Sequence, residues 1–129
     1  MFDFKEYYKV SKNIELDTKL SAQESYRRTA VSRAYYSAYK ISDIFLKDNY
    51  PTIYSGSKGK GGHQVVWNLF GIVDDLKGLG IQNRGLRLLE KRKKADYNSN
   101  DVVNKLDMRL SNNEAEEILK KIKEDPSES

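Results

Sequence analysis

The sequence has no cysteine, only two prolines and a single histidine in 129 residues. Without cysteine the chain forms neither disulfides nor thiolate metal sites. No apolar run approaches the roughly 20 residues that a membrane-spanning helix requires. Met1 to Tyr8 also lack the basic and then apolar order of a signal peptide. These absences predict a cytoplasmic protein with no membrane partner.

The motifs of common enzyme classes are missing as well. The sequence contains no P-loop, no dinucleotide fingerprint, no paired-histidine metal motif and no nucleophile elbow. We therefore expect no cofactor and no metal site. Any chemistry that needs an imidazole has to use His63, the only histidine.

The residues that are present suffice for one hydrophobic core. Hydrophobic residues make up 38% and charged residues 33% of the sequence, and the aromatic residues are 9 Tyr, 4 Phe and one Trp. A chain of this length has the usual size of one domain. We expect residues 1–125 to form a single helical domain and residues 126–129 to be a frayed tail.

Hydrophobic periodicity predicts an all-α fold with one long central helix. This helix is expected to begin at Ala22, because Ser21 and Glu24 form a capping-box pattern. It should end near Asn49, because Pro51 disfavours helical geometry in the residue before it. Small residues at four-residue spacing predict a seam where neighbouring helices pack closely: Ala30, Ala34 and Ala38.

Shorter helices are expected on both sides of the central one. They cover residues 3–17, 63–77 and 82–95, and a last one runs from the capping box of Ser111 and Glu114 to about Glu124. Residues 101–110 stay undecided between helix and irregular arm, and the glycine-rich residues 50–62 are expected to be loop. The expected fold class is thus a bundle of four to five helices.

Positive charge is concentrated in one segment. The formal net charge is +4 and the isoelectric point is near 9.1, yet the stretch from Arg84 to Lys94 holds six basic side chains and one acidic one. A solvated helix face accounts for such a run. A surface for nucleic acid is the alternative.

His63 follows a glycine-rich loop that carries Lys58 and Lys60. The backbone N–H groups of such a loop can cradle a phosphate, with the lysines and the imidazole beside it. The alternative is that His63 makes a cap or loop contact at the start of the next helix.

On the central helix, Arg33 and Lys40 are seven residues apart and therefore share one polar stripe, with Tyr36 and Ser37 between them. Cations beside a tyrosine suit a nucleobase that stacks on the ring and a phosphate that binds the cations. The alternative is that these side chains extend to water or pair with acidic residues.

Arg92 precedes Asp96 by four residues at a helix end, the spacing of an internal ion pair, and Tyr97 follows directly. That pair is the simpler interpretation. The alternative is that Arg92 holds a substrate phosphate through two hydrogen bonds while Asp96 orients the Arg or a neighbouring group.

Together these segments resemble a known family. Arg33-Ala-Tyr-Tyr-Ser-Ala-Tyr-Lys40, the Lys/Gly-rich loop before His63 with Phe70 beyond it, and Arg92-Lys-Lys-Ala-Asp-Tyr97 stand in the order and spacing of the small prokaryotic HEPN proteins. The similarity spans about Ala30 to Tyr97. It implies an antiparallel helical bundle, a homodimer, and a gene beside that of a minimal nucleotidyltransferase in a toxin–antitoxin or phage-defence module.

Many HEPN proteins are metal-independent endoribonucleases, in which an Arg binds the scissile phosphate and a His moves the proton of the 2′-OH. In this chain Lys40 stands where relatives often have that His, and Asp96 and Tyr97 stand where others have a His followed by a Tyr. For a cleaving enzyme the resemblance implies Arg33 and Arg92 as phosphate clamps, His63 as general acid or base, and Asp96 and Tyr97 as orienting groups.

The sequence leaves three functions open. The first is RNA or nucleotide binding in a toxin–antitoxin or phage-defence module, with endoribonuclease activity as a further step. The second is a non-catalytic partner subunit of a nucleotidyltransferase, in which Tyr97 or a nearby Tyr accepts the nucleotide. The third is a helical scaffold with a solvated basic face.

Overall fold

The computed structural model describes residues 1–57 and 62–122, and the regular elements in these ranges are all helical. Six α-helices and one 3₁₀ turn (η1) follow one another: α1 Lys5–Leu16, α2 Glu24–Asn49, α3 Pro51–Ser57, α4 Gln64–Ile72, η1 Lys77–Leu79, α5 Ile81–Tyr97 and α6 Lys105–Lys121. The predicted all-α fold is confirmed. The expected tail 126–129 lies outside the described residues.

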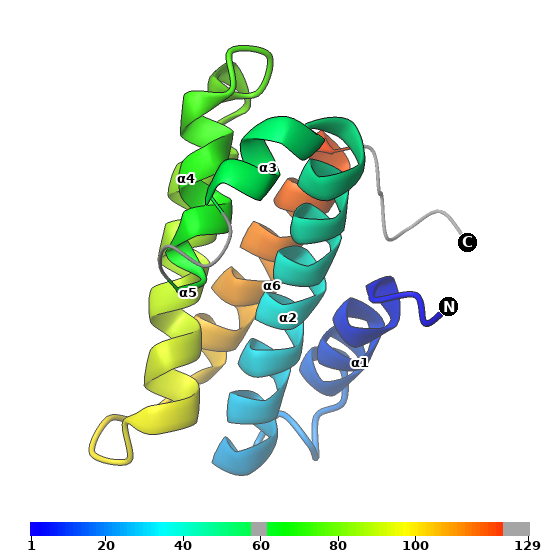
Figure 1. The fold of residues 1–129 in the computed structure, drawn as a ribbon. Helices are drawn as coiled ribbons and strands as arrows, with labels where there is room; N and C mark the ends of the chain where they lie inside the picture. Colours follow the sequence, from blue (N-terminus) through cyan, green and yellow to red (C-terminus); the bar gives the residue numbers. More distant parts are fainter. Residues whose placement is uncertain (58–61, 123–129) are drawn as a thin grey trace.

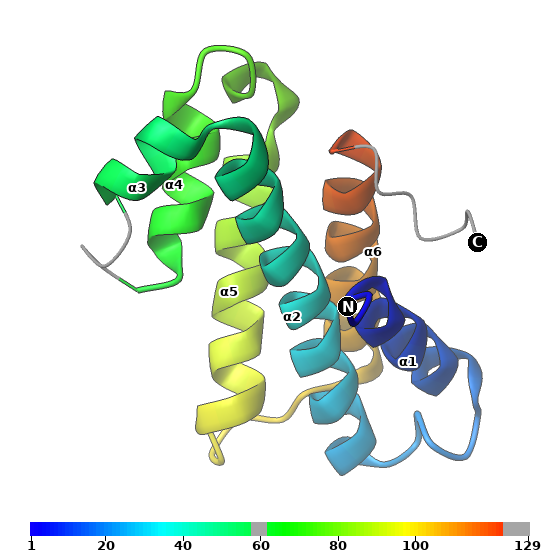
Figure 2. The ribbon, with the colours of Figure 1, turned by 45° about the vertical axis from the view of Figure 1, so that its right-hand side comes forward.

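The long helix α2 is the centre of the molecule. Figures 1 and 2 show α1, α5 and α6 arranged around it, and α2 packs against all three. Its seam of Ala30, Ala34 and Ala38 is 0% exposed, as small residues at a close helix crossing should be. Ser37 was expected on the polar stripe, but it is 0% exposed and belongs to the buried side.

The start of α2 differs from the prediction. The helix begins at Glu24, Gln23 is its N-cap, and no side chain caps it. The Ser21–Glu24 capping box does not form, because the Glu24 carboxylate accepts the backbone N–H of Val103 at 2.9 Å and pairs with Arg28. Glu24 therefore ties the start of α2 to the segment that leads into α6.

The start of α6 corrects a second prediction. A capping box does open the last helix, but Asn104 and Asp107 form it. The undecided residues 101–110 thus contain the first turns of α6. Ser111 lies inside the helix, fully buried, and its Oγ donates to the backbone carbonyl of Asp107 at 2.8 Å.

The expected loop 50–62 is partly helical, which gives one helix more than the predicted four to five. Pro51 occupies the first position of α3, where its missing N–H has no intrahelical partner to lose. Tyr54 anchors this helix, since its ring is buried and its hydroxyl donates to Asp43 at 2.8 Å. Residues 58–61, with Lys58 and Lys60, lie outside the described part of the chain.

The chain reverses between α4 and α5. The predicted helix 63–77 stops at Ile72, and a turn through η1 follows, which ends at Gly80 with a φ of +75°. This left-handed conformation suits glycine, and α5 begins directly after it. The reversal lays α4 against α5 (Figure 1). No helix in residues 1–57 and 62–122 is long and apolar enough to cross a bilayer.

Candidate functional site

The predicted site residues that the structure describes come from three places in the fold. Helix α2 supplies one stripe, the end of α5 packs along α2 (Figure 2), and the N-cap of α4 faces both. We call the resulting group the Arg–Tyr cluster, which consists of Arg33, Tyr35, Tyr36, Tyr39, His63, Arg92, Asp96 and Tyr97.

Arg92 is held by three partners. Its Nε donates to Asp96 Oδ2 at 2.9 Å, and its Nη2 donates to the hydroxyls of Tyr36 at 2.6 Å and Tyr97 at 3.0 Å. The ion pair suggested by the four-residue spacing is thus present, with the Arg92 side chain 12% exposed. The two N–H groups on Nη1 have no partner among the described residues, so they are free to bind a ligand.

Asp96 connects Arg92 to the central helix. Its Oδ2 also accepts a hydrogen bond from Ser32 on α2 at 3.3 Å, so the carboxylate links the two helices. An open pocket lies beside this link, between α2 and α5, and its lining residues are Arg28, Thr29, Ser32, Arg33, Ala95 and Asp96. The pocket gives a ligand access to the edge of the cluster.

Arg33 is held by aromatic rings. Its guanidinium carbon lies 4.6 Å from the centroid of the Tyr7 ring and 5.5 Å from that of Tyr36, and the side chain is half-buried. Within the described residues it has no carboxylate and no hydrogen-bond partner. Cation–π contacts fix the position of a guanidinium but leave its five N–H donors unused. The alternative of an ion pair is therefore not observed there.

Lys40 lies close enough to His63 for its charge to act on the imidazole, and its ammonium group has no hydrogen-bond or ion-pair partner among the described residues. The positive charges around the site belong to Arg33, Lys40, Arg92 and Lys93, and the negative charges belong to Asp96 and Asp43. The site therefore has a positive net charge. The polar groups of Arg33, Lys40 and Arg92 that have no partner among the described residues are all hydrogen-bond donors.

His63 is fixed by ring contacts and one hydrogen bond. Its ring stacks on Tyr39 at 4.1 Å with an interplanar angle of 8°, and its Nδ1 lies 3.0 Å from the Tyr35 hydroxyl. Burial lowers the pKa of His63 below 6.5, and the positive charges of Arg92 and Lys40 lower this pKa further. The imidazole is therefore neutral at pH 7.

A pH titration of the only histidine tests this electrostatic environment. We expect the proton NMR titration of His63 to have a midpoint below 6.5, because burial lowers the pKa of the imidazole and the charges of Arg92, Lys40 and Lys93 lower it further, while Asp43 raises it. Since this pKa is lowered on folding, its contribution to stability is present above pH 6.5 and is lost as the pH falls through the folded pKa. Lys40→Ala should raise the midpoint and Asp43→Asn should lower it. A midpoint that neither variant moves would contradict the assignment.

Several residues of the site were not among the predicted site residues. Tyr35 and Tyr39 belong to an apolar row of α2, and Trp67 lies beside the apolar stripe of α4, so periodicity assigns all three to the core. Tyr7 of α1 reaches Arg33 only through packing of α1 on α2. No sequence signal distinguishes these rings from ordinary core residues.

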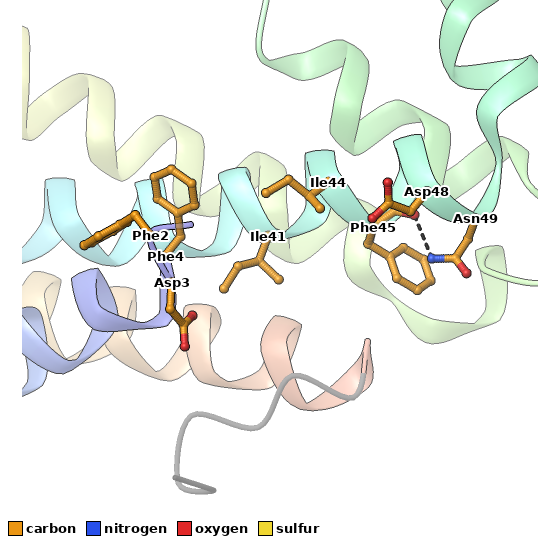
Figure 3. Close-up of a pocket in the computed structure, with 8 residues that line it drawn as sticks. All are labelled: Phe2, Asp3, Phe4, Ile41, Ile44, Phe45, Asp48 and Asn49. Atoms are coloured by element: carbon orange, nitrogen blue, oxygen red, sulfur yellow. Dashed lines mark hydrogen bonds between the residues drawn. The ribbon is translucent and has the colours of Figure 1, made fainter.

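A second concave surface lies elsewhere on α2 and is chemically different. It is a groove between the N-terminal segment and the later turns of α2, lined by Phe2, Asp3, Phe4, Ile41, Ile44, Phe45, Asp48 and Asn49 (Figure 3). Its charged groups are two carboxylates. An apolar groove with acidic residues repels a phosphate, so the Arg–Tyr cluster is the better candidate site.

Among the described residues, no group of three or more His, Cys, Asp or Glu side chains could hold a metal ion. In comparisons with known proteins, no family model, no curated protein and no solved structure matches this chain. The HEPN resemblance thus stays a prediction, and the geometry of the Arg–Tyr cluster is the main guide to function.

Proposed function

We propose that the protein binds RNA at the Arg–Tyr cluster, with a phosphate between Arg33 and Arg92. The observation that carries this proposal is the state of Arg33. A half-buried guanidinium held on two tyrosine rings, with no acidic partner in the described ranges, has all its donors available for an anion such as phosphate.

Arg92 supports the same ligand. It shares the Tyr36 ring with Arg33, since its guanidinium carbon lies 5.1 Å from the Tyr36 centroid and that of Arg33 lies 5.5 Å from it. Arg92 also keeps the two donors of Nη1 free among the described residues. Asp96, Tyr36 and Tyr97 occupy its other donors, so the guanidinium is pre-oriented. Pre-orientation reduces the conformational entropy that binding costs.

The aromatic side chains suit the bases of single-stranded RNA. Tyr97 is 71% exposed and its ring lies 5.0 Å from the Arg92 guanidinium carbon, so a base can stack on the ring while its phosphate contacts the cation. Base stacking of this kind contributes about 1–3 kcal/mol per base. The HEPN resemblance adds the proposed setting, which is a homodimer of antiparallel bundles in a toxin–antitoxin or phage-defence module.

Fluorescence anisotropy with a labelled single-stranded RNA tests the proposal. Arg33→Ala and Arg92→Ala should each weaken binding about tenfold, the effect of losing one charge-assisted contact of ~1.4 kcal/mol. Each variant should also reduce the slope of log affinity against log salt by about 0.7 per lost phosphate contact. Arg109→Ala is the matched control, because Arg109 is exposed on α6 outside the cluster. Equal affinity of all four proteins would refute the proposed site.

Cleavage is examined with the same proteins on a denaturing gel in the presence of EDTA. Cleavage that is lost in Arg92→Ala would establish a metal-independent endoribonuclease at this site. Bound but intact RNA would define a binding protein without that activity.

A second candidate function follows from the exposure of Tyr97. Its hydroxyl is 3.0 Å from Arg92 Nη2, so a cation is in place beside an accessible nucleophile. In the partner-subunit hypothesis, a minimal nucleotidyltransferase would transfer a nucleotidyl group from a nucleoside triphosphate to this oxygen. The hydroxyl loses its proton, a bond forms between the oxygen and the α-phosphorus, and the α–β phosphoanhydride bond breaks to release pyrophosphate. Intact mass after co-expression with such an enzyme should then increase by one nucleotide monophosphate, and Tyr97→Phe should abolish the increase. An unmodified wild-type protein would remove this candidate.

A further inference from the structure

A chain of hydrogen bonds connects the core to the only histidine. Tyr35 is 0% exposed, and its hydroxyl oxygen lies 3.2 Å from Trp67 Nε1 and 3.0 Å from His63 Nδ1. Trp67 is 0% exposed as well. The hydroxyl of Tyr35 thus stands between an indole that can only donate and an imidazole nitrogen that can donate or accept.

Counting protons along this chain determines the direction of each bond. The Trp67 N–H donates to the Tyr35 oxygen, because an indole nitrogen has no acceptor capacity. The Tyr35 hydroxyl then has one proton and one neighbouring acceptor among the described residues, which is His63 Nδ1. If Nδ1 carried the proton, the buried hydroxyl hydrogen would have no acceptor there, at a cost of about 1–3 kcal/mol.

The remaining ring nitrogen, Nε2, is the one that can bind a ligand. A neutral imidazole that accepts at Nδ1 carries its proton on Nε2. His63 Nε2 has no hydrogen-bond partner among the described residues, and stacking on Tyr39 holds the plane of the ring. Tyr35 is kept from ionising because burial raises its pKa, so it remains a donor at neutral pH.

We propose that Tyr35 is a positioning residue that holds His63 as the neutral Nε2–H tautomer, so that His63 donates a hydrogen bond to the RNA phosphate and does not accept the proton of a 2′-OH. This inference rests on the proposed function for its ligand. Of the two roles expected for His63, general acid or base, this inference argues against the base, because Tyr35 occupies the lone pair that a base needs. The N–H groups of Arg33, of Arg92 Nη1 and of His63 Nε2 would then all be donors to the phosphate.

The tautomer can be measured without any ligand, since the chain has one His and one Trp. With ¹⁵N-labelled histidine at pH 7.5, we expect Nε2 to carry the proton and Nδ1 to show the upfield shift of a hydrogen-bonded acceptor. Tyr35→Phe should move the Nδ1 resonance downfield and the Trp67 indole N–H resonance upfield, because both lose their hydroxyl partner. Tyr39→Phe retains the stacked ring and should leave both resonances in place. A proton on Nδ1 of the wild type, or an unmoved Nδ1 resonance in Tyr35→Phe, would overturn the proposal.

The role toward RNA is tested by two substitutions of His63. Glutamine keeps an N–H donor near the position of Nε2, so His63→Gln should retain affinity within about threefold, whereas His63→Ala should lose about tenfold. Equal losses in both variants would refute the donor role. If the wild type binds no RNA, the proposed function is wrong. The NMR experiment still tests the tautomer of His63, because it needs no ligand.

Discussion

Replacing Gly85 with alanine is expected to destabilise the protein by about 2 kcal/mol. Gly85 is buried in α5, and a β-carbon built at this position would overlap ring carbon atoms of Trp67 on α4. Neither the new methyl group nor the Trp67 ring can move aside, because the methyl group is fixed to a helix backbone and Trp67 is 0% exposed. Overpacking of this kind costs about 3 kcal/mol at the upper end of its usual range, and the better helix propensity of alanine offsets about 1 kcal/mol.

Chemical denaturation measures this effect against a matched control. Gly71→Ala makes the same change in α4, but the three atoms nearest to the new methyl group belong to the amide end of Gln82. This flexible side chain can rotate away, at the loss of one exposed hydrogen bond to Asn68. We expect Gly71→Ala to have a stability close to that of the wild type. If the two variants were equally stable, the packing of Trp67 on Gly85 would not constrain the helices as described.

The same substitution also links packing to the site. Trp67 donates to Tyr35, and Tyr35 contacts His63, so a displaced indole would disturb the hydrogen-bond chain. The folded fraction of Gly85→Ala should therefore show an upfield shift of the Trp67 indole N–H. An unshifted indole resonance in the folded variant would mean that α4 moves together with Trp67 and preserves the chain.

Local sequence rules predicted those parts of the fold that depend on neighbouring residues. The end of α2 before Pro51 follows from one proline, and α2 extends to Asn49 as predicted. The predicted starts of α2 and α6 were wrong, because capping patterns are common in sequences and tertiary contacts decide which of them form. Glu24 satisfies the distant N–H of Val103 instead of its own helix end. The helix α3 was missed because the burial of Tyr54 outweighs the preference of the surrounding residues for a loop.

The candidate site was likewise predicted only where it depends on residues that are close in the sequence. Helical spacing was enough to place Arg33 near Tyr36, and Arg92 near Asp96, because each pair lies on one helix. The approach of His63 to both helices depends on the chain reversal before α5, which periodicity cannot specify. Tyr35 looks like an ordinary core residue in the sequence, and only its two hydrogen-bond partners reveal a further role.

The largest effect on stability is expected where a buried amide joins three helices. Asn112 of α6 is 0% exposed, its Nδ2 donates to Glu15 Oε1 at 2.8 Å, and its Oδ1 accepts from the Ser11 hydroxyl. Ser11 Oγ also lies 2.6 Å from the backbone carbonyl oxygen of Ala30 on α2, so the single hydroxyl proton is shared between the two acceptors. This network therefore holds α1 against α2 and α6.

Asn112→Asp changes one atom of this network and should destabilise the protein by about 3 kcal/mol at pH 7.5. The substitution keeps the size and shape of the side chain but replaces the N–H donor with a carboxylate oxygen that faces the Glu15 carboxylate. An unpaired charge buried in this way costs about 3–5 kcal/mol, and the nearby Lys12, 3.3 Å from Glu15, compensates in part. Asn113→Asp is the control, since the neighbouring Asn113 is exposed and its substitution should change stability by less than about 0.5 kcal/mol.

The pH dependence distinguishes charge repulsion from lost packing. Two carboxyl groups in contact share a proton readily, so the folded pKa of the introduced pair lies above its unfolded value of about 4. The penalty is therefore complete above that raised pKa and decreases as the pH falls through it, because one shared proton restores a hydrogen bond between residues 112 and 15. Urea unfolding at pH 7.5 and pH 5 should show a smaller difference between Asn112→Asp and the wild type at the lower pH. A difference that is the same at both pH values would mean that the cost comes from packing, and that α1 is not held by the amide of Asn112.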